Sequence, residues 1–280
     1  MNYIISLGIY LAKKKEINMR IVSWNCRYGF SEKKNEIITE NSPDVLIIQE
    51  CMYQNCVEIG NFYENKIWYG DGKDSLLGIG IFSNKYSFEL LPRHYYDSDF
   101  RYIVPYMVKN NNEKYTILVV WTKEKIKNDL KHCLSYVENI HMAIDHYKSL
   151  LPTSTIIIGD FNSNQKWDKD YKKENNHSSL IEKLNKLQMI NCAEKFSNKD
   201  TYYYMHKGKA YSVIDDYCFV SKNLIIKNFE VGDPEKYLEY SDHCPIIIDI
   251  EPIKYEIIYA TIDELTEKEI FPILAKIEDK

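Results

Sequence analysis

The sequence predicts an α/β protein in which two β-sheets pack face to face and helices cover their outer surfaces. Two observations predict this architecture. Short apolar runs typical of buried strands recur along the chain in two sets, and each set has its own helical segment. The chain has 280 residues, 45% hydrophobic and 28% charged, which is enough for one large domain with a full core.

The first set of elements lies before residue 121. Arg20 to Asn25 is an apolar run that predicts the first strand. A polar stretch after it predicts a short helix that Ser31 caps and Pro43 follows. Apolar runs bounded by turn residues then predict strands at 44–50, 78–83, 102–108 and 115–120.

The second set begins with the longest helical pattern. Apolar residues recur at three- and four-residue steps from Ile126 to Leu151, and Pro152 ends the pattern. The β-branched run Ile156 to Ile158, directly before Gly159, predicts a strand buried on both faces. A second amphipathic helix is expected at 180–187, and further strands at 201–204, 211–221 and 246–249.

Polar residues lie at the ends of four of these predicted strands, after three of them and before the last. Asp160 and Asn162 come after the Ile-rich strand and share parity, so both side chains leave the same side if the extended geometry persists. A local alternative is an Asx turn, because Asp and Asn favour turns. Core strands gain nothing from terminal carboxylates, however, and a buried one is costly unless it is paired or binds a metal. The other strand-end residues are Asn25, Glu50, Asp242 and His243.

Five motifs occur in a fixed order between Trp24 and Pro245. They are Trp-Asn at 24–25, Gln-Glu at 49–50, Gly-Asp-Phe-Asn at 159–162, Ile-Asp-Asp-Tyr at 214–217 and Ser-Asp-His-Cys-Pro at 241–245. In this order they resemble the motifs of the endonuclease/exonuclease/phosphatase (DNase I-like) superfamily. The resemblance implies a four-layer α-β-β-α sandwich, with two packed, mostly antiparallel sheets, for a catalytic domain at 19–252.

The resemblance also implies a role for each strand-end residue. Glu50 would bind Mg²⁺, with Mn²⁺ as an alternative ion, and Asn25 and Asp242 would support the metal. Asp160 would deprotonate the attacking water, and Asn162 would position that water. His243 would donate to a phosphate oxygen. Its partner is either Asp215 or Asp216, and Asp216 is preferred because the Tyr-x-Phe-Val-Ser run after it matches better.

The sequence departs from the family pattern at one place. Many members have a His or a Tyr after the strand that matches 117–120, where this chain has Trp-Thr-Lys. Candidates for the missing leaving-group donor are Lys123, Tyr102 and His177. Trp121 is either a stacking platform for a base or part of the packing. His177 has an equally simple interpretation as a polar residue before a helix.

Composition limits the functional classes. The net charge of −5 gives no global positive field, which argues against a protein that coats DNA tightly without specificity. Seven cysteines without metal-ligand spacing favour a reduced, cytoplasmic protein. We expect a monomer. The apolar part of residues 1–18 is too short to span a bilayer, so we expect no stable membrane insertion.

The two ends of the chain are set apart from the catalytic domain. We expect residues 1–18 to be an upstream extension, either a start-site artefact or a short peripheral segment, with a surface anchor as a third interpretation. Residues 253–280 carry two capping-box patterns, which predict a partly helical tail without a role in the chemistry.

The leading functional hypothesis is a Mg²⁺-dependent phosphodiesterase that acts on nucleic acid. One alternative is a phosphatase for a small phosphorylated metabolite or a lipid headgroup, which the acidic balance favours. The other is a catalytically silent binding module, which the missing His or Tyr favours. Replacing Asp160 separates the two enzyme hypotheses from the binding module, because only an enzyme would lose turnover.

Overall fold

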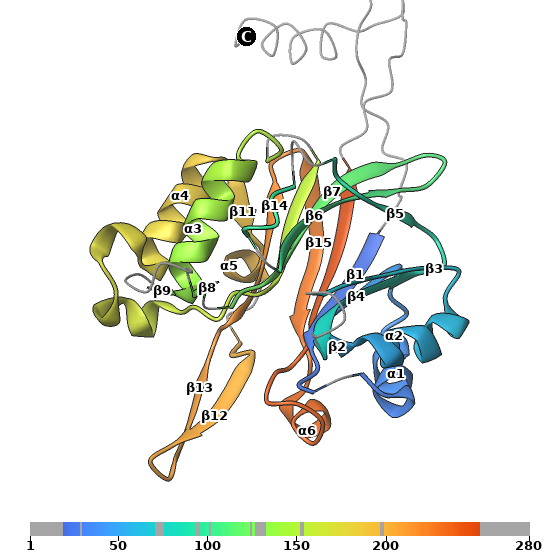
Figure 1. Ribbon diagram of the computed structural model, residues 1–280, viewed down its shortest axis with the longest axis horizontal. Helices are drawn as coiled ribbons and strands as arrows, with labels where there is room; N and C mark the ends of the chain where they lie inside the picture. Colours follow the sequence, from blue (N-terminus) through green and yellow to red (C-terminus); the bar gives the residue numbers. More distant parts are fainter. Residues whose placement is uncertain are drawn as a thin grey trace, which may run out of the picture. The chain divides into compact units, whose positions relative to one another are not determined.

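Two six-stranded β-sheets pack against each other in the computed structural model, which describes residues 19–252 apart from 29, 71–75, 93–95, 101, 124, 127–132, 152–153 and 197–198. Helices lie on the outer side of each sheet (Figure 1). This arrangement is the DNase I-like α/β sandwich, and it confirms the predicted fold class.

Sheet I contains the first and the last strands of the described chain. Its strand order is β15-β16-β1-β2-β4-β3. The strands are β1 (Met19–Asn25), β2 (Val45–Met52), β3 (Asn65–Tyr69), β4 (Leu77–Ser83), β15 (Leu224–Val231) and β16 (Ile246–Pro252).

Sheet II contains the strands from the middle of the chain. Its strand order is β11-β14-β10-β7-β6-β5. The strands are β5 (Ser87–Leu90), β6 (Ile103–Lys109), β7 (Lys114–Trp121), β10 (Thr155–Asp160), β11 (Met189–Asn191) and β14 (Asp216–Ser221).

Each sheet has a parallel pair of strands among antiparallel neighbours. β1 pairs parallel with β2, and β7 pairs parallel with β10. β16 and β14 run antiparallel to β1 and β10, so they begin where those strands end. The carboxyl ends of the parallel pairs and the first residues of β14 and β16 thereby meet along one edge, which we call the active-site rim. The sheets are therefore mixed, although most neighbours are antiparallel as expected.

Helices cover the outer faces of both sheets. α1 (Glu32–Thr39) and α2 (Tyr53–Ile59) lie beside sheet I, and α3 (Tyr136–Tyr147) and α4 (His177–Lys186) lie beside sheet II (Figure 1). Ser135 and Glu138 form a complete capping box that starts α3. The shorter helices are α5 (Cys192–Phe196) and α6 (Pro234–Tyr237), with 3₁₀ turns at Gly60–Phe62, Gln165–Asp170 and Lys173–Asn175.

Because successive side chains of a strand point to opposite faces of the sheet, the core is divided into two layers. Ile156 and Ile158 of β10 join the large cluster between the sheets, whereas Ile157 joins the cluster under α3 and α4. Asp160 follows Ile158 by two positions and Ile156 by four, so the three side chains lie on the same face of β10. Its carboxylate is therefore directed between the two sheets at the active-site rim, and not toward the outer helices.

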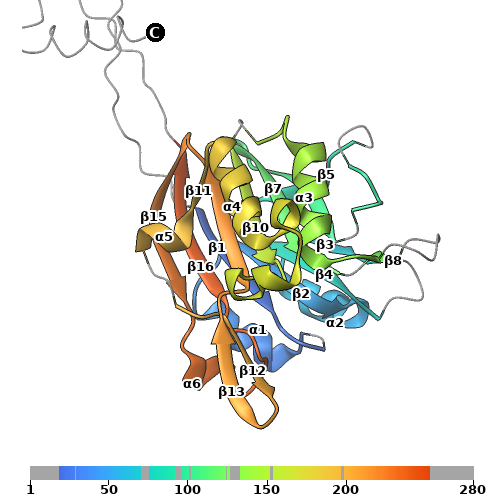
Figure 2. The same ribbon diagram turned by 90° about the vertical axis from the view of Figure 1, so that its left-hand side faces the viewer.

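Two expectations about elements need correction. The predicted long helix does not begin at Ile126, because β8 (Lys125–Ile126) pairs with β9 (Cys133–Leu134) and α3 starts only at Tyr136. The predicted strand 211–221 is two strands. Its first part, β13 (Lys209–Val213), forms a separate hairpin with β12 (Tyr202–His206), and this hairpin projects from the sheets (Figures 1 and 2).

The predicted extension at 1–18 and the predicted tail at 253–280 lie outside the described residues. Within the described part of the chain, no helix has the length and apolar character needed to cross a membrane. The described cysteine side chains are all free and buried, where they pack as small apolar groups.

Candidate active site

Asp160, at the end of β10, is the centre of the polar groups at the active-site rim. One of its oxygens, Oδ2, accepts hydrogen bonds from Nδ2 of Asn25 and from Nδ2 of Asn162, both at 2.9 Å. The other oxygen, Oδ1, accepts from the backbone N–H of Asn162 at 2.8 Å. The carboxylate is completely buried, and burial raises its pKa to about 7 against the opposing charge of His243.

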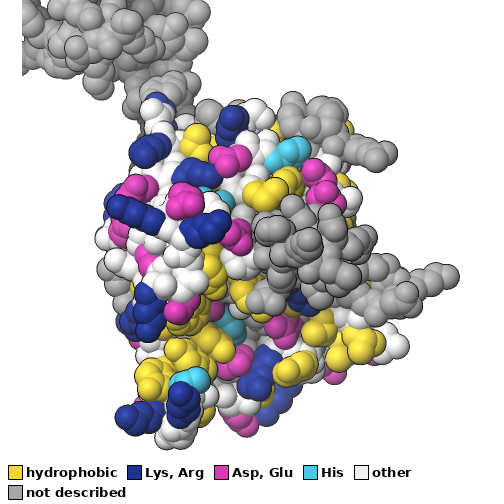
Figure 3. Space-filling view, turned by 60° about the vertical axis from the view of Figure 1, so that its left-hand side comes forward, with side chains coloured by type: hydrophobic (Ala, Val, Ile, Leu, Met, Phe, Trp, Pro, Cys, Tyr) yellow, Lys and Arg dark blue, Asp and Glu magenta, His cyan; other side chains and the backbone are white. Residues whose placement is uncertain are grey.

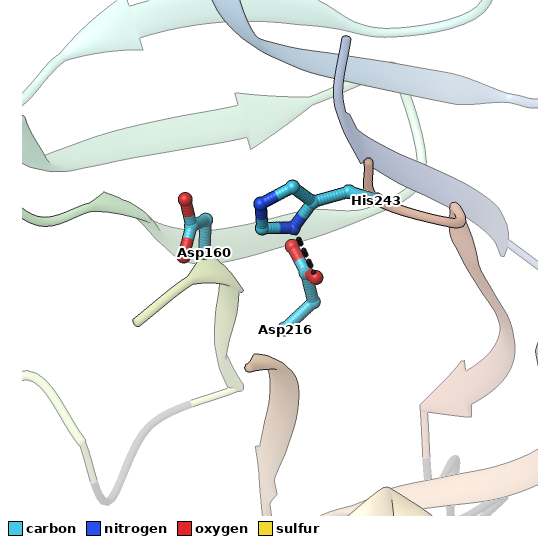
Figure 4. A group of neighbouring side chains, drawn as sticks. All are labelled: Asp160, Asp216 and His243. Carbon is cyan, nitrogen blue, oxygen red and sulfur yellow. Dashed lines mark hydrogen bonds and ion pairs between the residues drawn. The ribbon is translucent and has the colours of Figure 1, made fainter. Parts of the chain in front are cut away.

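His243 approaches Asp160 from the segment before β16. Its Nδ1 lies 2.8 Å from Oδ2 of Asp216, the first residue of β14. One ligand-type atom from each of Asp160, Asp216 and His243 lies within 4.8 Å of the others. Burial disfavours a charged ring, but the charge and the hydrogen bond of Asp216 outweigh it and raise the pKa of His243 to about 10. The second ring nitrogen is turned toward the Asp160 side (Figure 4).

Hydrogen bonds from sheet I hold His243 in this position. Trp24 Nε1 donates to the His243 carbonyl at 2.7 Å. Ser241 Oγ accepts from the His243 N–H at 3.1 Å and donates to the Asn25 carbonyl at 2.7 Å. The Trp-Asn motif and the Ser-Asp-His motif are therefore joined directly, although more than 200 residues separate them in the chain.

Glu50 lies on the sheet I side of the same rim. The register between β2 and β4 shifts between Ile48 and Cys51, and Glu50 has a φ of +56°. A bulge of this kind re-aims a side chain. Glu50 Oε1 accepts from Asn25 Nδ2 at 3.3 Å, so Asn25 bridges the Glu50 and Asp160 carboxylates.

The Glu50 carboxylate fits a hard divalent cation better than the His243 cluster does. Such ions take oxygen ligands and often only one or two protein carboxylates, with water completing the shell. Glu50 is half-buried, and among the described residues its oxygens accept hydrogen bonds from Asn25 Nδ2 and from the Tyr28 N–H at 3.2 Å. His243, in contrast, is positively charged and already paired with Asp216, so it would repel a cation.

Asp242 lies at the sheet I side of the rim as well. Its Oδ2 is 3.5 Å from Nη1 of Arg27. Arg27 in turn donates its backbone N–H to Asn25 Oδ1 at 3.1 Å. As the side chains stand, Asn25 directs its amide nitrogen and not its oxygen toward Glu50, so a metal contact from Asn25 requires its amide to rotate.

The two neighbouring aspartates before β14 have different partners. Asp216 faces His243, whereas Asp215 accepts the Ser163 N–H at 2.5 Å. Both are buried, and burial raises the pKa of Asp215 well above its usual range. Of the two aspartates left open as the partner of His243, Asp216 is therefore the one that faces the ring, whereas Asp215 lies in the loop before β14.

Three of the four residues that were candidates for leaving-group or substrate contacts lie together at the end of β7, the strand that pairs with β10. Trp121 is in register with Asp160 across the parallel pair. The ring of Tyr102 is 4.5 Å from the Trp121 ring, and both side chains are 2% exposed. Lys123 Nζ is 3.8 Å from the centre of the Trp121 ring. Lys123 is therefore a cation held over the aromatic ring of Trp121, two residues after the position that pairs with Asp160.

His177, the fourth candidate, belongs to a separate layer under α4. Its Nδ1 is 2.9 Å from Ser163 Oγ, and its ring packs on Tyr217 at 5.0 Å. Burial lowers the pKa of His177 to about 4, so the ring is neutral. These contacts match the interpretation of His177 as a buried polar residue near a helix start.

Sequence reasoning missed two residues that touch the site. The Thr122 carbonyl accepts from Asn162 Nδ2 at 3.2 Å. The ring of Tyr202 lies 4.5 Å from the His243 ring. No local pattern identifies either contact, because each joins residues that are 40 or more positions apart. The tyrosine run at 202–204 was an available signal for an aromatic strand beside the site.

Comparisons with known proteins agree with this geometry. A family model described as "Endonuclease-reverse transcriptase" matches residues 116–247, which include Asp160, Asn162, Asp216, Asp242 and His243. No sequence among the curated proteins matches the chain.

Several solved structures share the fold. The endonuclease domain of TRAS1, a telomere-specific non-LTR retrotransposon, aligns with a TM-score of 0.58 and 17% identity, over 84% of this chain and 100% of that chain. An endonuclease/exonuclease/phosphatase from Bacteroides vulgatus aligns with a TM-score of 0.57 and 15% identity, over 85% and 100%. D. rerio TDP2 complexed with single strand DNA product aligns with a TM-score of 0.56 and 13% identity, over 84% and 100%.

The matched region contains most of the rim residues, and the shared fold extends over the described sandwich. Residues 116–247 are therefore similar to that endonuclease family, and the chain has the fold of the endonuclease/exonuclease/phosphatase (DNase I-like) proteins.

Proposed function

We propose that this protein is a divalent-metal-dependent phosphodiesterase that cleaves nucleic acid. One observation carries the proposal. The buried carboxylate of Asp160, whose pKa is near neutral pH, and the charged imidazole of His243 face each other between the two sheets. Glu50 lies beside them and offers oxygen ligands for a cation. Hydrolysis of a phosphate ester needs an activated water and compensation of charge on the phosphate oxygens, and these groups supply both.

Asp160 would take the proton of the attacking water. Two amides, those of Asn25 and Asn162, donate to one of its oxygens and fix the orientation of the carboxylate. A pKa of about 7 lies near the working pH, which is where a general base is most effective. Asn162 is held in turn by the Thr122 carbonyl, so its amide can orient the water and Asp160 together.

His243 would donate a hydrogen bond to a non-bridging phosphate oxygen. Asp216 engages Nδ1, which leaves the second ring nitrogen as the donor on the Asp160 side (Figure 4). Donors of this kind act mainly in the transition state, where negative charge on the phosphate oxygens grows. Asp216 keeps the ring charged and therefore keeps it a donor.

Glu50 would hold the divalent cation, with Asn25 and Asp242 supporting that side of the rim. When bound, the cation neutralises phosphate charge and stabilises the leaving oxygen. In place of the His or Tyr found in many relatives, Lys123 beside Trp121 is the cation that would assist the leaving group. The TRAS1 endonuclease domain and the TDP2 complex with DNA product support nucleic acid as the substrate class.

The test is cleavage of plasmid, duplex and single-stranded oligonucleotides by the full chain with Mg²⁺, with Mn²⁺ and with EDTA. We expect cleavage that requires the metal and disappears in Asp160→Asn. Turnover of p-nitrophenyl phosphate that depends on Asp160, without any nucleic-acid cleavage, would overturn the nuclease proposal in favour of a phosphatase. No turnover of any of these substrates would favour a silent binding module.

A further inference from the structure

The β12–β13 hairpin carries a row of aromatic rings that starts at His243. The Tyr202 ring lies 4.5 Å from the His243 ring. Tyr204 stacks on Tyr202 at 5.2 Å with an interplanar angle of 15°, and Tyr211 stacks on Tyr204 at 5.5 Å with an angle of 19°. At these distances the nearly parallel rings are offset-stacked on one another, so Tyr204 lies within the row and Tyr211 ends it with 43% of its surface exposed.

Hydrogen bonds fix this hairpin to the catalytic segment. Tyr202 forms a β-bridge with His243, and the Tyr203 N–H donates to the Asp242 carbonyl at 2.9 Å. Thr201 Oγ1, at the base of the hairpin, accepts the N–H groups of Asp215 and Asp216 at 2.9 and 3.0 Å. The aromatic row therefore has a defined direction from the catalytic imidazole outward.

The outer part of the row is accessible and positively charged. Tyr211 is 43% exposed, and Tyr204 is half-buried. Residues 201–213 contain Lys207 and Lys209 but no Asp or Glu, in a chain whose net charge is −5. Hydrophobic side chains gather over the hairpin with lysines and a histidine beside them (Figure 3). A polyanion with flat apolar groups complements such a surface.

We propose that the aromatic row, which ends in Tyr211 and is supported from within by Tyr204, stacks unpaired bases of the strand whose phosphodiester lies at His243. The proposal deepens the nuclease function and rests on it. Aromatic side chains bind single strands because every base has a π face, whereas in a duplex those faces are covered by neighbouring pairs. The substrate is therefore single-stranded or locally unpaired beside the scissile phosphate.

Binding measured without turnover tests the row. Fluorescence anisotropy with a labelled single-stranded oligonucleotide and the matching duplex, in an Asp160→Asn background with Mg²⁺, reports affinity. We expect Tyr204→Ala and Tyr211→Ala each to weaken single-strand binding by about 5- to 150-fold, the usual effect of losing one stacked base. Tyr204→Phe and Tyr211→Phe keep the ring and should stay within threefold.

Matched variants exclude a structural explanation. Met205 is 68% exposed and adjacent to Tyr204 in β12, so its side chain lies on the opposite face of the hairpin, and Met205→Ala should leave binding unchanged. Tyr211→Leu keeps an apolar side chain without an aromatic face and should lose affinity as Tyr211→Ala does. In proteins that keep Asp160, the substitutions Tyr204→Ala and Tyr211→Ala should raise KM for oligonucleotides, while the turnover of bis(p-nitrophenyl) phosphate stays constant.

The outcomes for the two proposals are separate. Unchanged single-strand affinity in both alanine variants, or an equal loss for the duplex, would overturn the stacking role even if the enzyme cleaves DNA. Absence of single-strand binding by the Asp160→Asn protein in which Tyr204 and Tyr211 are intact would overturn it as well. Failure of the nuclease function would instead be seen as missing cleavage by wild type, whatever the hairpin binds.

Discussion

At the scale of single residues, Asp160 and His243 have pKa values shifted in ways that suit complementary proton roles. Burial raises the pKa of Asp160 to about 7, so the carboxyl group can exchange a proton near neutral pH. Asp216 raises the pKa of His243 to about 10, so the ring stays a donor. Pairs of groups whose environments separate their pKa values are typical of acid–base sites.

Replacing Asp160 with Asn should abolish turnover with little effect on folding. The amide cannot accept the proton of water, and general-base catalysis contributes about 10²- to 10⁴-fold. Steady-state rates and thermal melts of the purified variant check this expectation. A variant with more than a tenth of the wild-type rate would contradict the assigned role.

Removing the imidazole in His243→Ala should slow turnover by about 10²- to 10³-fold, the usual effect of deleting one donor to a developing charge. KM should change less than kcat, because the donor acts mainly in the transition state. Kinetics with an oligonucleotide and with bis(p-nitrophenyl) phosphate provide the measurement. A loss below threefold would argue against a donor role for this ring.

The rate should depend on pH through the same two groups. Activity requires Asp160 ionised, so kcat/KM should rise through pH 7, and it requires His243 charged, so the rate should fall near pH 10. In Asp216→Asn the charge that raises the imidazole pKa is gone, and the alkaline limb should move to lower pH. If the alkaline limb stays at the same pH in this variant, the titration of a group other than His243 causes it.

At the scale of elements, the end of β10 depends on a glycine. Gly159 has a φ of +137°, and a Cβ there would lie 2.0 Å from the Val120 carbonyl oxygen of the parallel neighbour β7. The strand can approach β7 closely only without a side chain at this position. Asp160 follows directly, so the glycine also sets where the central carboxylate lies.

The Gly159→Ala substitution should therefore cost about 1–3 kcal/mol of unfolding free energy and reduce turnover, because β10 must shift away from β7. Gly208→Ala is a matched control. Gly208 has a φ of +74°, but no atom lies within 4 Å of its added Cβ. The control should cost less stability and leave turnover of bis(p-nitrophenyl) phosphate unchanged. Denaturant titration and kinetics measure both variants. Equal losses of stability and turnover in the two variants would contradict the explanation by crowding against Val120.

The start of α4 should make the fold sensitive to acid. His177 has a native pKa of about 4, below its usual value of 6.5, so the unfolded chain binds a proton first as the pH falls. Stability is therefore lost between pH 6.5 and pH 4. At pH 5 this amounts to about 2 kcal/mol.

The variant His177→Gln should be less stable at pH 7.5, because the contact with Ser163 is lost, but its stability should fall less between pH 7.5 and pH 5. Urea unfolding of both proteins at the two pH values measures the difference. Equal pH dependence in the two proteins would show that another group controls the acid sensitivity.

At the scale of the whole molecule, local pattern was sufficient for the strands and for much of the rim. β1, β2, β4, β6, β7, β10 and β16 lie where apolar runs predicted them, because buried strands need such runs. The motifs then identified groups that the parallel pairs bring together. The roles of these residues, the monomeric state and the cytoplasmic location stay predictions.

Contacts between distant segments account for what pattern did not reveal. Ile126 has helical spacing with later apolar residues, yet its segment pairs with Cys133 in an antiparallel ladder. By contrast, the Tyr-x-Phe-Val-Ser run was enough to prefer Asp216 over Asp215, and Asp216 is the residue that pairs with His243. Tyr202 meets His243 only because the hairpin is tied to the segment before β16. For Ile126 and Tyr202, tertiary pairing overrides or completes the local preference.

The metal site should affect the stability of the whole domain. A ligand that binds only the native state raises the melting temperature by an amount that grows with the logarithm of its concentration above Kd. Adding Mg²⁺ should therefore stabilise wild type, and EDTA should reverse the effect. Glu50→Gln should lose this response while its melting temperature in EDTA stays close to wild type. An unchanged Mg²⁺ response in Glu50→Gln would direct the search for the ion to other carboxylates.

β1 and β16 are neighbours in sheet I, with Met19 opposite Ile250. The polypeptide thus enters and leaves the sandwich at adjacent points. A short linker across these points would permit circular permutation, with new termini opened in an exposed turn such as the one at Asn110. For the same reason the sandwich could be inserted as a cassette into a surface loop of a host protein without separating its first strand from its last.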